Sequence, residues 1–187
     1  MNNRTAVIFP GIGYHTDKPL LYYGKKLVRA YGYDIVEVSY GGFPKDVKGN
    51  AEKMREAFHS ALAQAETILK ETDLKSCGEP LFISKSVGTA VAAAYAKKHK
   101  IKARHIYFTP VAQSFPFMEQ EGIVFHGTAD PWVDTETVRQ GCEERNLPLY
   151  VTEDADHSME TGDVGRDLEI LAEIMKRCGL FLQVPVQ

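Results

Sequence analysis

Three polar residues, each placed after a β-like run, carry the side chains that nucleophilic acyl transfer requires. Ser86 could supply the attacking hydroxyl, and His157 could accept its proton. Asp130 could hold the imidazole in the correct tautomer and stabilise its charged form. Each follows a separate predicted strand, and the carboxyl ends of parallel strands meet at one edge of a sheet. The sequence therefore predicts a serine nucleophile with an acid–base pair.

The nucleophile lies in the segment 84–88, which reads Ser-Lys-Ser-Val-Gly between an apolar run and an alanine-rich one. A serine on a sharp strand-to-helix turn needs small residues two positions before and after it, and Ser84 and Gly88 meet that need around Ser86. Ser84 is the weaker candidate nucleophile, because Phe82, two positions before it, is too large where the turn needs a small residue. Taken alone, the turn could also be an ordinary helix N-cap.

The acid and the base come from two later loops. Asp130 lies in the segment 126–133, His-Gly-Thr-Ala-Asp-Pro-Trp-Val, where an Asp-Pro turn is the alternative explanation and Asp134 the weaker candidate acid. His126 is interpreted as a residue that braces this turn. His157 follows the last predicted strand, and this position favours a catalytic role over that of an ordinary solvated histidine.

Together these segments resemble the α/β-hydrolase superfamily, from the first strand to the last helix. The turn at Ser86 resembles the nucleophile elbow G-x-S-x-G, with Ser84 in place of the first glycine. The segment 126–133 is similar to the family's H-G-x-x-D-x-x-V, and this similarity implies Asp130 as the triad acid. The residues around His157 resemble the family's histidine loop, with Met159 where an aromatic residue is common. The resemblance implies a small serine hydrolase, similar to an esterase, thioesterase or dienelactone hydrolase, that needs no cofactor.

The resemblance also implies an oxyanion hole made of two backbone N–H groups. Val87, at the start of the helix, would give one donor. The loop after the first strand would give the other from Ile12, or from Gly13 as the alternative. Gly11 and Gly13 let this backbone approach a ligand closely. A dinucleotide-binding loop is disfavoured, because Thr16 stands where the third glycine of G-x-G-x-x-G would be.

Several residues near the predicted active edge are candidate substrate contacts. Four aromatic residues in these loops either line an acyl or alcohol pocket or pack the loops: Phe43, Phe115, Phe117 and Trp132. The connection 109–122 is too short for a helical lid, so we expect an open site for a small ester or thioester. A metal site is not expected, because the histidines have no close ligand spacing. The candidate contacts are Gly11, Gly13, Tyr14, Phe43 and Trp132.

Short apolar runs alternate with longer amphipathic runs along the whole chain. This alternation predicts an α/β protein, a three-layer α/β/α sandwich with a mostly parallel sheet of about six strands and no lid. We expect one domain over 1–187. The predicted strands are 5–9, 34–40, 81–83, 104–108, 123–125 and 149–152, and the predicted helices are 18–31, 47–70, 87–98, 135–144 and 163–177.

Bulk properties exclude several classes of protein. The 187 residues have a formal net charge of −3, which gives no electrostatic reason for a nucleic-acid or membrane partner. The three cysteines include no Cys-x-x-Cys pair and favour reduced thiols over disulfides or structural zinc. Because no apolar leader or membrane span is evident, we expect a cytoplasmic protein, with its oligomeric state left open.

Two rivals to hydrolysis share the same expected fold. One is a binding module without catalysis, since a fold alone does not determine function. The other is an acyltransferase in which an alcohol or amine replaces water. The complete set of serine, aspartate and histidine favours an enzyme over a binding module.

Overall fold

The computed structural model describes residues 4–43, 47, 49–119 and 121–184. The predicted start of the chain at 1–3 and position 48 of the predicted helix 47–70 lie outside the described residues. Six parallel strands form one sheet in the order β2-β1-β3-β4-β5-β6. The strands are β1 (Thr5–Phe9), β2 (Asp34–Glu37), β3 (Leu81–Lys85), β4 (Arg104–Phe108), β5 (Gly122–Gly127) and β6 (Leu149–Thr152).

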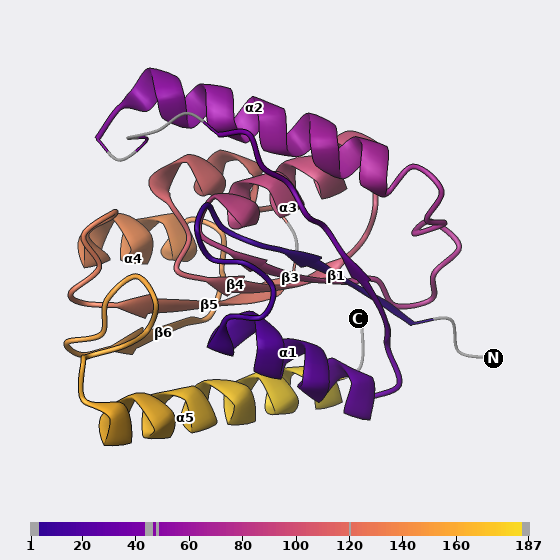
Figure 1. The fold of residues 1–187 in the computed structure, drawn as a ribbon. Coiled ribbons are helices and arrows are strands. Elements are labelled where there is room, and N and C mark those ends of the chain that lie inside the picture. Colours follow the sequence, from indigo (N-terminus) through magenta and orange to yellow (C-terminus); the bar gives the residue numbers. More distant parts are fainter. Residues whose placement is uncertain (1–3, 44–46, 48, 120, 185–187) are drawn as a thin grey trace.

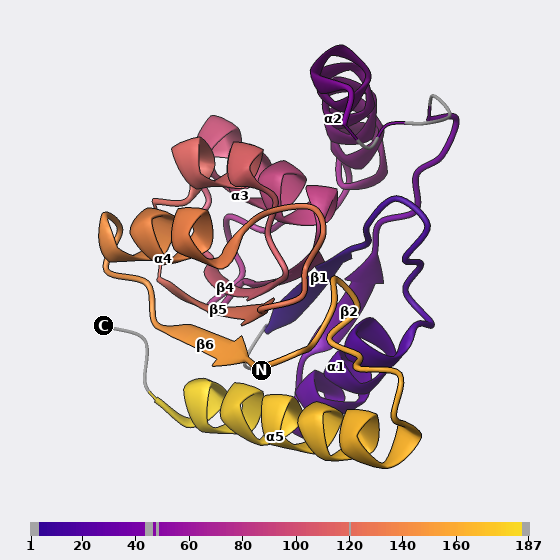
Figure 2. The same cartoon turned by 90° about the vertical axis from the view of Figure 1, so that its left-hand side faces the viewer.

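Helices cover both faces of this sheet, so the predicted three-layer α/β/α sandwich is confirmed. On one face lie α1 (Pro19–Ala30) and α5 (Val164–Gln183), as Figure 1 shows. On the other face lie α2 (Ala51–Ile68), α3 (Val87–His99) and α4 (Thr135–Glu143), which Figure 2 shows from the side. Between β4 and β5 the described residues form a short 3-10 helix, η1 (Ala112–Phe117).

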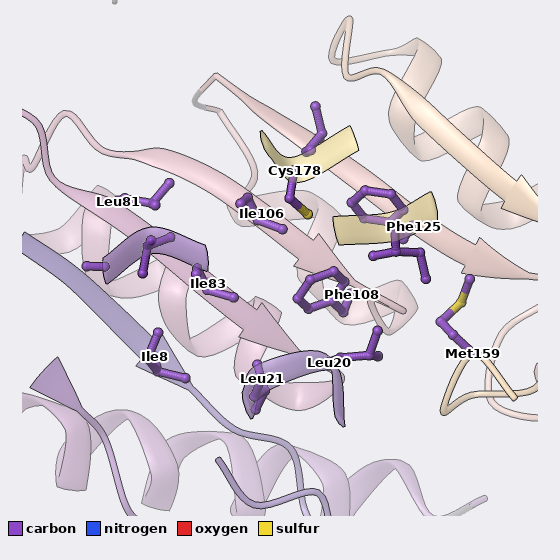
Figure 3. Packing of buried hydrophobic residues seen from close by; sticks show 14 of the residues in the cluster. Ile8, Leu20, Leu21, Leu81, Ile83, Ile106, Phe108, Phe125, Met159 and Cys178 are labelled. Carbon is purple, nitrogen blue, oxygen red and sulfur yellow. The ribbon is translucent and has the colours of Figure 1, made fainter. Parts of the chain in front are cut away.

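The core explains why the strands read as apolar runs. Every residue of β1, β3, β4 and β5 is buried, because helices pack on both sides of a parallel sheet. Ile83 and Phe108 point toward α1 and α5 within one cluster, seen from close by in Figure 3. Phe9 and Phe82 belong to the cluster under α2 and α3. The alanine-rich first three turns of α3 are buried throughout, which lets this helix lie against the sheet.

Several predicted element ends differ from the structure. The second strand is predicted to reach residue 40 but ends at Glu37. It is the edge strand beside β1, and the chain leaves the sheet after Val38. Helix α2 begins at Ala51 because Asn50 caps it, accepting a hydrogen bond from the Lys53 N–H at 3.0 Å. Helix α5 continues past residue 177 to Gln183, since Phe181 and Leu182 still pack on the core.

The strand order reverses beside β1. The chain goes from β1 to β2 on one side and then to β3 on the other. At such a switch point the loops beyond the carboxyl ends diverge and leave a crevice for a ligand. The loop after β1 and the turn from β3 into α3 flank this point, so the fold places Ser86 at its edge.

Candidate active site

Ser86 lies between β3 and α3 with an unusual backbone conformation. Its φ is +56° and its ψ is −127°, values that few residues other than glycine adopt and that cost about 1–3 kcal/mol. Its N–H donates to the Phe108 carbonyl at 3.0 Å, which holds the turn on the neighbouring strand. Gly88 is required here because a Cβ at that position would lie 2.3 Å from the Pro10 carbonyl oxygen. The turn therefore has the sharp form that the sequence predicts.

The two serines of this turn lie in different surroundings. Ser84 belongs to β3, is fully buried, and donates its hydroxyl to the Ile106 carbonyl at 3.4 Å. Ser86 lines a cavity of about 270 Å³ together with His157, Tyr14 and other loop residues. Of the two hydroxyls, that of Ser86 is the one that a substrate in this cavity could meet.

A chain of hydrogen bonds joins the three residues expected to carry the chemistry. The Nε2 atom of His157 lies 2.8 Å from Oγ of Ser86, and its Nδ1 atom lies 2.7 Å from Oδ2 of Asp130. The other carboxylate oxygen of Asp130 accepts the Trp132 N–H at 2.8 Å. The structure thus brings together side chains that are far apart in the sequence and follow three different strands, in the arrangement of a nucleophile, a base and an orienting acid.

Close backbone contacts join the acid loop to the histidine loop. A Cβ on Gly127 would lie 2.1 Å from the Ala155 carbonyl oxygen, so only glycine allows this approach. The same carbonyl accepts the Ala129 N–H at 2.9 Å. The Asp154 N–H donates to Oγ1 of Thr128 at 2.8 Å. These contacts fix the separation of Asp130 and His157 through the backbone.

Two residues that sequence reasoning missed stabilise the histidine loop by side-chain hydrogen bonds. Thr109, directly after β4, donates its hydroxyl to the His157 carbonyl at 3.0 Å. Oδ1 of Asp156 accepts the N–H groups of Ser158 at 2.6 Å and Glu160 at 3.1 Å. The position of Thr109 at a strand end was the available signal for the first, and an aspartate two residues before a loop serine was the signal for the second.

Burial and hydrogen-bond partners together set the charge states of Asp130 and His157. Burial lowers the pKa of His157 and the nearby Lys85 cation lowers it further, while the hydrogen bond to Asp130 raises it; the net shift is downward. Burial raises the pKa of Asp130, but the His157 hydrogen bond and the Trp132 N–H outweigh it, and its pKa falls. At neutral pH the pair is therefore a carboxylate beside a neutral imidazole, as a general base requires.

Lys85 is the unexpected residue of the site. It directly precedes Ser86, is fully buried, and within the described part of the chain its Nζ has no hydrogen-bond partner. The ammonium lies 4.9 Å from the centre of the Tyr14 ring, within range of a cation–π contact. Burial lowers the pKa of Lys85 to about 7, against opposition from Asp130 and Asp156. The sequence marks this residue only as a variable position of the turn.

The two backbone groups expected to hold an oxyanion both border the small cavity. Ile12 and Val87 line it, and neither N–H donates a hydrogen bond to another described residue. Gly13, the alternative donor, also lines it. Gly11 lies against Ser86 instead, since a Cβ there would come 3.0 Å from Cβ of Ser86. Its role in the structure is thus to let the β1 loop approach the turn.

The candidate substrate contacts divide into two groups. Tyr14 and Trp132 line the small cavity, and the Trp132 ring lies 5.4 Å from the His157 ring. Phe43 does not line it; its ring packs 5.7 Å from that of Tyr40, at the edge of the core cluster beneath α2. The prediction placed Phe43 too close to the site, because the strand before it is at the edge of the sheet.

The remaining polar and aromatic candidates support the loops. Nε2 of His126 lies 3.1 Å from Oγ1 of Thr135, and Nδ1 lies 3.8 Å from Oδ2 of Asp130, in line with a bracing role. Asp134 caps α4 by accepting the Thr137 N–H at 2.8 Å. The Phe115 ring packs against Gly141, where an added Cβ would lie 2.6 Å from it.

Two further properties concern metals and membranes. Among the residues that the structure describes, no three His, Cys, Asp or Glu side chains gather closely enough to hold a metal ion. None of the described helices has the length and apolar character needed to cross a bilayer.

Comparison with known proteins gives matches in structure but not in sequence. No protein-family model and no curated protein sequence matches the chain. An α/β serine hydrolase homologue from Coxiella burnetii is 16% identical, with a TM-score of 0.69 over 95% of this chain and 85% of that one. A serine hydrolase without a lid from Xanthomonas campestris is 16% identical, with a TM-score of 0.61 over 98% and 83%.

A third similar structure is an esterase from Pyrococcus furiosus. It is 15% identical, with a TM-score of 0.67 over 97% of this chain and 83% of that one. At such identities the likeness concerns the fold, which extends over nearly the whole chain. With its parallel six-stranded sheet, and with only η1 between β4 and β5 in the described residues, the chain has the α/β-hydrolase fold.

Proposed function

We propose that this chain is a serine hydrolase that cleaves a carboxylic ester or thioester through an acyl-enzyme on Ser86. The observation that carries the proposal is the hydrogen-bonded chain from Ser86 through His157 to Asp130 at the wall of a cavity. A binding module would have no need of this complete chain. The hydrolase fold and the esterase among the similar structures add support.

In the first half of the reaction, Nε2 of His157 takes the proton of Ser86 as Oγ attacks the carbonyl carbon. The carbonyl oxygen becomes an oxyanion, and the N–H groups of Ile12 and Val87 stabilise it. When the tetrahedral intermediate collapses, the bond to the alcohol or thiol breaks, and the imidazolium returns its proton to that leaving group. Asp130 stabilises the imidazolium throughout.

In the second half, water takes the place of the leaving group. His157 removes a proton from the water as its oxygen attacks the acyl-enzyme, and a second oxyanion forms. Collapse breaks the bond to Oγ, releases the carboxylic acid and returns the proton to Ser86. The atoms balance without a metal or cofactor, and hence the proposal includes neither.

We also propose that the protein is located in the cytoplasm. Cys77, Cys142 and Cys178 are all buried and form no disulfide with one another, which suits the reducing cytoplasm. We propose a small-molecule substrate and no nucleic-acid or membrane partner.

A fluorophosphonate probe and a set of p-nitrophenyl esters and acyl thioesters test the mechanism. We expect one covalent adduct, located at Ser86, and a loss of roughly 10⁴-fold or more in hydrolysis by Ser86→Ala. Ser84→Ala is the matched control, because its hydroxyl is buried in β3, and it should keep both the adduct and the hydrolysis. Equal rates for wild type and Ser86→Ala would overturn the mechanism. Absence of the adduct in a folded protein would favour a binding module.

A further inference from the structure

A second cavity, larger than the one at Ser86, lies between α2 and the adjoining end of α3. It measures about 630 Å³, against about 270 Å³ for the smaller one. Its walls come from the first turns of α2, the first turn of α3, and η1 with the residue before it. Figure 2 shows α2 at the top of the view, with α3 below it. The cavity lies where α2 faces the start of α3 and η1.

The two cavities adjoin. Met54 of α2 and Val87 of α3 line both of them. Val87 is the residue directly after the nucleophile, so the larger cavity begins one residue from Ser86. A substrate held at Ser86 therefore has the larger cavity directly beside it.

The lining of the larger cavity is suited to hydrocarbon. Phe58 of α2 stacks on Phe117 of η1, with ring centres 5.5 Å apart and planes inclined by 18°. Ala90, almost fully buried, adds a small apolar wall from α3. The lining residues with polar side chains are all solvent-exposed: Glu52, Arg55, His59 and Gln113. A cavity of this size with an apolar interior is typical of a site for a small organic molecule.

The position of His157 decides which part of an ester would enter. As the general acid, His157 must lie beside the leaving alcohol or thiol, and the acyl group then points to the other side of Ser86. His157 and Trp132 line the small cavity but not the larger one. The larger cavity is therefore on the acyl side, and we call it the acyl cavity.

We propose that the acyl cavity binds the hydrocarbon chain of the substrate acid, and that the preferred substrates are esters or thioesters of acids with about eight or more carbons. This inference rests on the proposed function, because the cavity is assigned by its place beside Ser86. At roughly 30 Å³ for a methylene-sized group, comparable to a water molecule in the liquid, a chain of about ten carbons needs about 300 Å³ and fits.

The test compares p-nitrophenyl acetate, butyrate, octanoate and decanoate, which share one leaving group. Full burial of one methylene is worth about fourfold in binding, so we expect kcat/KM for octanoate to exceed that for butyrate by at least about tenfold. Ala90→Leu should lower the octanoate-to-acetate ratio by about tenfold, since its added carbons occupy the acyl cavity. If Ala90→Leu does not fold, Met54→Trp replaces it. This substitution narrows the junction of the two cavities and should lower the same ratio.

Ala63→Leu is the matched control, because Ala63 is exposed on α2 and does not line the acyl cavity. It should leave the ratio unchanged. A rate that stays flat or falls from acetate to decanoate, with a fluorophosphonate adduct still formed at Ser86, overturns the acyl-chain assignment and leaves the hydrolase intact. A lack of both adduct and acetate hydrolysis overturns the proposed function, and the assignment with it.

Discussion

Two neighbouring regions of the molecule are built in opposite ways. The catalytic corner, made of Ser86, Asp130, His157 and their loops, is held by hydrogen bonds to the loop backbone and by glycines whose missing side chains allow close contact. The acyl cavity beside it is bounded by side chains from α2, α3 and η1. Because positions in the corner are fixed through the backbone, changes there should affect every substrate alike. Changes around the acyl cavity should depend on which substrate is tested.

The largest expected effect comes from the acid of the catalytic corner. In Asp130→Asn the side-chain amide can donate a hydrogen bond to Nδ1 of His157, which favours the wrong tautomer of the imidazole. We therefore expect kcat to fall by about 10⁴-fold for the acetate and octanoate esters alike. Steady-state kinetics with both p-nitrophenyl esters measure this. Asp134→Asn is the control, because asparagine still caps α4, and its rates should match wild type. A loss confined to one ester would contradict the division into two regions.

A smaller but still general loss is expected at the contact between the two loops. Gly127→Ala places a Cβ 2.1 Å from the Ala155 carbonyl, so the histidine loop must shift. A shift of about 1 Å in a catalytic group costs about 10²-fold in rate. Kinetics and thermal unfolding should be measured together with Gly41→Ala, where nothing lies within 4 Å of the added Cβ. Unchanged hydrolysis by Gly127→Ala would show that the corner tolerates displacement.

Lys85 gives a pH-dependent test of the corner. Its folded-state pKa of about 7 lies below the ordinary value of 10.5, so the unfolded chain binds more protons between these values and stability rises with pH across that window. Below pH 7 the full cost of burying the cation remains. Lys85→Met should therefore stabilise the protein by a few kcal/mol at pH 6, with the gain shrinking toward pH 10. Urea unfolding at pH 6 and pH 9 checks this, and an equal or smaller gain at pH 6 would contradict it.

The same substitution should move the pH profile of hydrolysis. The Lys85 cation disfavours protonation of His157, so its removal raises the pKa of His157. The acid limb of kcat/KM, where His157 becomes protonated and loses its role as base, should then shift to higher pH in Lys85→Met. An acid limb that stays in place would show that burial and Asp130 alone set the pKa of His157.

The smallest effect is expected at Phe43. Its ring packs on Tyr40 and lines neither cavity, so Phe43→Ala should change kcat/KM by less than about threefold for both acetate and octanoate. Its effect should appear in thermal unfolding instead. A loss specific to octanoate would extend the acyl cavity to the β2 side of the molecule.

The sequence carried most of the fold and the reactive residues, because both depend on local patterns. Alternating apolar runs predicted the layers, and short motifs after strands located Ser86, Asp130 and His157. The missed features depend on packing between distant segments. Tertiary contacts that leave no periodic signal set three of them: the burial of Lys85 beside Tyr14, the bond from Thr109 to the histidine loop, and the cavity lined by α2, α3 and η1.

The backbone of Ser86 has a consequence for laboratory evolution. Its left-handed φ is one that glycine adopts freely, so Ser86→Gly should relax the turn and make the protein harder to unfold while removing the nucleophile. A selection for heat resistance alone would therefore favour inactive variants with glycine at position 86. A screen that scores product as well as survival would keep serine at position 86.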